Sequence, residues 1–123
     1  MSRFFFVIAS FFGFLAVAGG AFGAHELRQT LSPEMLAIFE TAVRYQVYHT
    51  FALALAAWAS GKYEDRHFLV AGWLFVTGVA LFSGSLYILA LSGTHWWGAV
   101  TPVGGVAFLA GWIYLTWGFW RVR

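Results

Sequence analysis

The sequence contains no cysteine and very little charge. The absence of cysteine excludes disulfide frameworks, thiolate zinc sites, iron–sulfur clusters and cysteine nucleophiles. Charged residues make up only 10 % of the 123 residues, whereas a soluble domain of this size needs a larger charged share on its surface. The net charge of +2 is too small to indicate a surface that binds nucleic acid. These absences leave a protein whose surface is mostly solvated by lipid.

The residues that are present favour membrane helices, because 61 % of the chain is hydrophobic. A helix of about 20 apolar residues spans the roughly 30 Å of hydrocarbon in a bilayer. We therefore predict an all-α integral membrane protein, with four transmembrane helices in one bundle and a single domain over residues 1–123. The predicted spans are 4–24, 41–60, 68–91 and 102–120. A cleaved secretory signal peptide is the alternative interpretation of the first segment.

The second predicted span begins with a polar stretch that is ill suited to lipid, from Glu40 to His49. Its helix is expected to start outside the hydrocarbon, with an interfacial portion at 33–40, because Ser32 can cap it and Pro33 fits the first helical position. At 1.5 Å per residue, His49 then lies near the midplane of the bilayer. Glu40 and Arg44 have the spacing of a helical ion pair. The fold is expected to hide this polar face from lipid.

Other polar and small residues fall at the same depth, in the half of the bundle remote from the termini. We hypothesise a polar intramembrane cluster of Glu40, Arg44, Tyr45, Gln46, Tyr48, His49, Ser83 and Ser85. Glycines let helix backbones approach closely, and those predicted to do so are Gly19, Gly20, Gly23, Gly84, Gly104 and Gly105. The space beside the glycines is expected to receive Arg44, Tyr45 and Tyr48. A seam between copies of the chain is the alternative use of the Gly19–Gly23 pair.

The distribution of positive charge predicts the orientation. Four spans place both termini on one side of the membrane, and most Lys and Arg residues gather there: Arg3, Lys62, Arg66, Arg121 and Arg123. The positive-inside rule then places both termini in the cytoplasm. The charged run Glu64–Arg66 between the second and third spans is interpreted as a solvated turn.

Four motifs together resemble one family. They are Gly20–His25, Phe39–His49, Leu81–Tyr87 and Thr101–Gly105, and the resemblance extends over nearly the whole chain. The family is domain-of-unknown-function family 423, whose members are small inner-membrane proteins related to animal transmembrane protein 256. The resemblance implies a multi-pass protein of the cytoplasmic (inner) membrane of a bacterium. It implies no established activity.

The sequence favours a non-enzymatic role. No nucleophile elbow, phosphate-binding loop or HExxH motif is present, and no two histidines have the spacing of helical metal ligands. We therefore expect no catalytic residues, no metal and no cofactor. The predicted role is a structural or accessory subunit that packs with itself, as a homo-oligomer, or with a larger membrane protein complex. The alternative is a small transporter, channel or lipid- or quinone-binding protein that uses the polar cluster.

Overall fold

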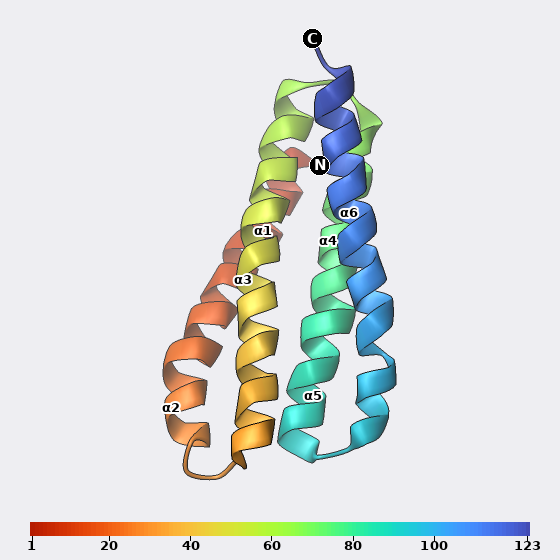
Figure 1. The fold of residues 1–123 in the computed structure, drawn as a ribbon. Helices are drawn as coiled ribbons and strands as arrows, with labels where there is room; N and C mark the ends of the chain where they lie inside the picture. Colours follow the sequence, from red (N-terminus) through yellow and green to blue (C-terminus); the bar gives the residue numbers. More distant parts are fainter.

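Residues 1–123 are described by a computed structural model, which is all-helical (Figure 1). Four long helical segments follow one another, joined by short connections. Their elements are α1 (Ser2–Val17), η1 (Ala18–Gly23) and α2 (Ala24–Leu27); α3 (Pro33–Lys62); α4 (Arg66–Gly78), η2 (Val79–Ser83) and α5 (Gly84–Ser92); and η3 (His95–Ala99) and α6 (Thr101–Arg121). The all-α prediction is confirmed.

Local sequence signals account for the helix ends. Ser32 accepts a hydrogen bond from the Met35 N–H at 3.2 Å, so it caps α3 with Pro33 at the first position. Gly93, at φ 72°, ends α5 in the left-handed conformation that glycine adopts readily. The elements η1 and η2 are π-helical turns, which the sequence did not predict.

Three segments are long and apolar enough to cross a membrane: Ser2–Leu27, Arg66–Ser92 and His95–Arg121. The fourth long helix, α3, has 30 residues but is not among them. It carries Glu40, Arg44 and His49, so its composition is too polar for a span by itself. Length and composition thus support three of the four predicted spans.

The segments pack side by side in a simple order (Figure 1). α1 lies along α3, α3 lies along α4 and α5, and α4 lies along α6. Both termini point toward the end where α3 turns into α4, and the opposite end holds the α2–α3 and α5–α6 connections. We call the half of the molecule at that opposite end the distal half.

Phenylalanines packed on glycines hold α4 and η2 against α6. A Cβ on Gly78 would lie 2.3 Å from the ring of Phe108, so only glycine fits there. The reverse arrangement recurs at three levels spaced seven residues apart: Phe68 on Gly118, Phe75 on Gly111 and Phe82 on Gly104. A seven-residue repeat keeps the same faces of two packed helices in register along their length.

The half nearer the termini has an apolar core. Phe5 of α1 is fully buried and packs on Gly72 of α4, where an added Cβ would lie 2.5 Å from its ring. α3 presents small buried side chains to this core, which let its neighbours approach: Ala52, Ala56, Ala57 and Ala59.

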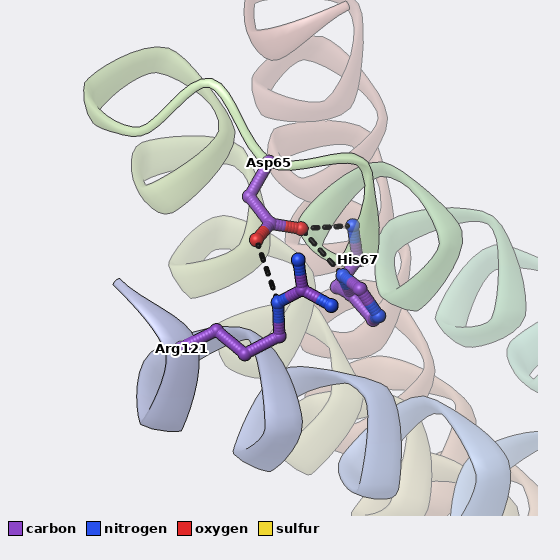
Figure 2. A network of polar contacts seen from close by, with 3 residues as sticks. All are labelled: Asp65, His67 and Arg121. Carbon is purple, nitrogen blue, oxygen red and sulfur yellow. Dashed lines mark hydrogen bonds and ion pairs between the residues drawn. The ribbon is translucent and has the colours of Figure 1, made fainter. Parts of the chain in front are cut away.

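Asp65 links the α3–α4 turn to the end of α6 (Figure 2). Its carboxylate accepts a hydrogen bond from the His67 backbone N–H at 2.9 Å, which caps α4, and contacts the His67 ring. Arg121 Nε lies 3.7 Å from the other carboxylate oxygen. The His67 backbone N–H, followed by the His67 side chain, lowers the pKa of Asp65. The prediction of a merely solvated turn is therefore wrong for Asp65.

Candidate functional site

A laterally open groove of about 660 Å³ lies in the distal half, between α3 and α6. The lining comes from α3 on one side and α6 on the other, with η2 contributing a single ring. Its residues are Tyr45, Tyr48 and His49 of α3, Phe82 of η2, and Pro102, Gly105, Val106, Phe108, Leu109 and Trp112 of α6. Most are apolar or aromatic, so the groove presents a hydrocarbon-like surface.

His49 and Trp112 close the inner end of this groove. The indole Nε1 of Trp112 donates a hydrogen bond to His49 Nε2 at 3.0 Å, and the imidazole stacks on Phe108 with ring centroids 3.5 Å apart. Since Nε2 accepts this bond, the proton of the neutral ring sits on Nδ1, which donates to the Tyr45 carbonyl at 2.7 Å. Both ring nitrogens of the buried His49 are therefore engaged within the protein.

Gln46 joins three helical segments through its buried side-chain amide. Its Nε2 donates to the Phe12 carbonyl of α1 at 2.8 Å, and its Oε1 accepts from the Tyr87 hydroxyl of α5 at 2.7 Å. The backbone carbonyl of the same residue accepts from Thr50 at 2.7 Å. Apolar surroundings make such partners necessary, because burying a polar group without a hydrogen bond costs about 2–7 kcal/mol of free energy.

The two predicted serines are buried in separate contacts. Ser83 Oγ donates to the Ala42 carbonyl of α3 at 2.8 Å. Ser85 Oγ lies 2.6 Å from the hydroxyl of Thr101 at the start of α6. The sequence identified both serines but neither partner residue, because Ala42 has no side-chain signal and Thr101 was noted only as part of the Thr101–Gly105 motif.

Glu40 and Arg44 do not join the buried network. Both side chains are exposed, and the only ion pairs of the structure involve Asp65. The expected Glu40–Arg44 pair is therefore absent. Tyr45 and Tyr48 are 37 % and 52 % exposed on the wall of the groove. The eight residues of the hypothesis thus divide into a buried set, Gln46, His49, Ser83 and Ser85, and an exposed set, Glu40, Arg44, Tyr45 and Tyr48.

The predicted packing glycines divide as well. Gly19 and Gly20 face Val43, and Gly23 faces Phe39. A Cβ added to Gly104 would lie 2.3 Å from the backbone nitrogen of Phe82. Gly105 makes only ordinary contact with Phe82, and nothing lies within 4 Å of a Cβ on Gly84. Apolar side chains thus occupy the space beside Gly19, Gly20 and Gly23, so the expectation that Arg44, Tyr45 and Tyr48 fill it is wrong there. Tyr45 and Tyr48 instead line a groove together with Gly105.

Trp112 is the site residue that sequence reasoning missed. It lies in an apolar helix that contains two other tryptophans, Trp117 and Trp120, and the sequence gives no local signal that distinguishes it from them. Only the rotation of α6 about its axis brings its indole to His49. No group of three or more His, Asp and Glu side chains in the structure could hold a metal ion.

Comparison with known proteins connects this fold to a family. The family described as "Protein of unknown function (DUF423)" matches residues 19–105. The UPF0382 inner membrane protein YgdD of Escherichia coli strain K12 is 43 % identical over 122 residues, which cover 99 % of this chain and 93 % of that protein. The UPF0382 membrane protein SH2409 of Staphylococcus haemolyticus is 42 % identical over 113 residues, covering 92 % of each chain. No solved structure matches this chain.

The matched residues run from the glycine-rich turn η1 to the start of α6, and they include the buried Gln46, His49 and Ser83. The alignment with an inner membrane protein over nearly its whole length agrees with the three apolar helices of the fold. This chain is an integral membrane protein, and it belongs to the DUF423 family, whose members have no established function.

Proposed function

We propose that the chain is a non-enzymatic, four-helix transmembrane bundle of the bacterial inner membrane, with α3 as the fourth span. α3 lies along α1, α4 and α5 (Figure 1), and its 30 residues extend about 45 Å. Its buried polar side chains Gln46 and His49 are engaged in hydrogen bonds within the protein, His49 through both ring nitrogens. Basic residues near the termini support cytoplasmic termini: Arg3, Lys62, Arg66, Arg121 and Arg123.

The function that the site supports best is the binding of one lipid chain in the groove between α3 and α6. The observation that carries this proposal is the shape of the groove. It extends along α6 from Pro102 to Trp112, and the ten steps of helical rise between these two residues measure about 15 Å, half the thickness of the hydrocarbon core. A groove of this length, open to the side, matches the depth of one leaflet.

The polar atoms of the groove suit the head of such a molecule. Neither the Tyr45 nor the Tyr48 hydroxyl bonds any group of the protein, although both residues line the groove. Side chains on a helix lean toward its N-terminus, so these hydroxyls point toward the outer end of the groove. A hydroxyl group in an apolar environment is stabilised when it donates a hydrogen bond to an acceptor. The occupant is therefore an ester-linked phospholipid of the outer leaflet, with a carbonyl at the tyrosines and its chain extending to Trp112.

A photoreactive phospholipid tests this proposal. The protein is reconstituted in vesicles that contain a phosphatidylglycerol with a diazirine in its acyl chain, and labelled residues are identified by mass spectrometry. We expect the label on groove residues, and a several-fold loss of it in Val106→Trp, which fills the groove. Val103→Trp is the matched control, since Val103 lies on the same helix, is similarly exposed and does not line the groove.

Equal labelling of the parent and Val106→Trp would contradict lipid binding in the groove. Competition by a small mole fraction of unlabelled ubiquinone would instead identify a quinone as the preferred occupant. Each outcome is read on the same set of labelled peptides.

The second candidate function is the structural or accessory subunit expected from the sequence. The observation that favours it is the outward face of α3, where Glu40 and Arg44 are exposed without a partner in their own chain. A helix of another protein molecule could supply their partners.

A further inference from the structure

One face of α3 is covered by none of its neighbours. Its residues are spaced by three, four or seven positions, so they share one side of the helix, and all are exposed: Glu40, Arg44, Phe51, Leu55 and Trp58. We call them the α3 face. Phe51 is 71 % exposed, although it lies near the centre of the longest helix. The α3 face points away from the buried side of α3, which holds Ala42, Gln46 and Leu53.

The charges of the α3 face require partners at the depth that they occupy. If Ser60 marks the inner edge of the hydrocarbon, a 30 Å span reaches Glu40, and Arg44 lies about 6 Å deeper than Glu40. A charged side chain inside a bilayer is energetically costly unless it finds a counter-charge or reaches the interface. Neither Glu40 nor Arg44 makes an ion pair in its own chain.

We infer that the α3 face binds the same face of a second copy of this chain. All copies insert into the membrane in one orientation, so a two-fold axis along the membrane normal brings two α3 helices together in parallel. Glu40 then lies one helical turn from the partner's Arg44, and the partner's Glu40 lies one turn from Arg44. Two reciprocal ion pairs form, and the complementarity of this single face is the reason for choosing a second copy as the occupant.

The remainder of the α3 face is suited to the same contact. Phe51, Leu55 and Trp58 continue it toward the inner interface without any charge. Lipid tails are as apolar as these side chains, so the hydrophobic effect does not drive helices together in a bilayer. Close packing of aromatic and aliphatic side chains holds the helices together instead. The paired charges fix the register of the two helices, and the apolar residues below them provide the contact area.

Disulfide cross-linking in native membranes tests the inference, because the chain has no cysteine of its own. Leu55→Cys is oxidised with copper phenanthroline, and we expect a disulfide-linked dimer of this protein alone. Ile113→Cys is the matched control: Ile113 is 67 % exposed on α6, at a similar depth but away from the α3 face, and is expected to remain monomeric.

Charge reversal then isolates the ion pairs. In the Leu55→Cys background, Glu40→Arg or Arg44→Glu alone is expected to abolish the dimer band. Co-expression of the two single reversals restores both pairs between unlike copies, so differently tagged chains should cross-link to each other. The double reversal Glu40→Arg/Arg44→Glu should also recover the dimer, which shows that the altered chains still insert and fold.

The inference fails if Leu55→Cys gives no dimer or if it cross-links to a protein of another mass. It also fails if the charge reversals leave the yield of the dimer unchanged. It rests on the proposed fourth span, α3, but not on lipid binding in the groove. Val106→Trp is expected to leave the cross-link unchanged, and the charge reversals are expected to leave photolabelling of the groove unchanged. The two proposals can therefore fail separately.

Discussion

At the scale of single residues, the buried polar side chains of this protein are all satisfied. No buried side-chain nitrogen or oxygen lacks a hydrogen-bond partner. Gln46 and His49 each bond groups on other helical turns, and Ser83 bonds the backbone of α3 across a helix interface. A bilayer offers no water to replace these partners, so the bonds that join different helices fix the rotation of each helix against its neighbour.

The Trp112–His49 bond can be tested alone. Trp112→Phe keeps an aromatic ring beside Phe75 but removes the donor, which leaves His49 Nε2 without a partner. We expect a loss of about 1 kcal/mol in the free energy of unfolding, the usual size of a hydrogen bond between membrane helices. SDS-induced unfolding followed by circular dichroism measures it. Trp117→Phe, at an exposed site of the same helix, is the control, and an equal effect in both variants would contradict the assignment.

At the scale of elements, the contact between η2 and α6 defines the distal half. The π-helical turn places Phe82 against Gly104 of α6 and the adjacent Ser83 against Ala42 of α3. Two consecutive residues thus fix η2 to two different helices. The same turn supplies the ring of Phe82 to the groove. The sequence indicated glycines in this region but could not identify which ones meet a backbone.

Two glycine substitutions distinguish a close contact from an open position. In Gly104→Ala the new Cβ would lie 2.3 Å from the Phe82 nitrogen and 2.7 Å from its Cα, so no side-chain rotation relieves the clash. We expect a destabilisation of about 1–3 kcal/mol. Gly84→Ala meets nothing within 4 Å and should be neutral or stabilise by up to about 1 kcal/mol, since alanine favours helix. Thermal unfolding in detergent compares them, and similar melting temperatures would contradict the close approach.

At the scale of the whole molecule, the central question is whether α3 crosses the membrane. Its neighbours α1 and α4 supply apolar partners on its buried side. Its Glu40–His49 portion, however, is more polar than is usual for a helix that faces lipid. With α3 as a span, the α2–α3 connection and the α3–α4 turn lie on opposite sides of the membrane. With only three spans, both would lie on the same side.

Cysteine labelling distinguishes the two topologies, again because the native chain has no cysteine. A membrane-impermeant maleimide applied to intact spheroplasts should label Thr30→Cys at once, and Glu64→Cys only after lysis. Labelling of both positions before lysis, or of neither, would overturn the fourth span. Labelling of Glu64→Cys alone would keep four spans but invert their orientation.

The sequence by itself determined the lipid-solvated class, the helical content, three apolar spans and the start of α3 at Ser32–Pro33. These properties are local: hydropathy and capping act within a few turns of one helix. Tertiary structure alone decided that Gln46 and His49 turn inward while Arg44 turns outward, that Trp112 binds His49, and that Val43 and Phe39 fill the space beside the glycines of η1. These properties depend on how each helix is rotated about its own axis and on its register with its neighbours. Rotation and register are set by contacts between residues far apart in the chain, which a hydropathy pattern does not record.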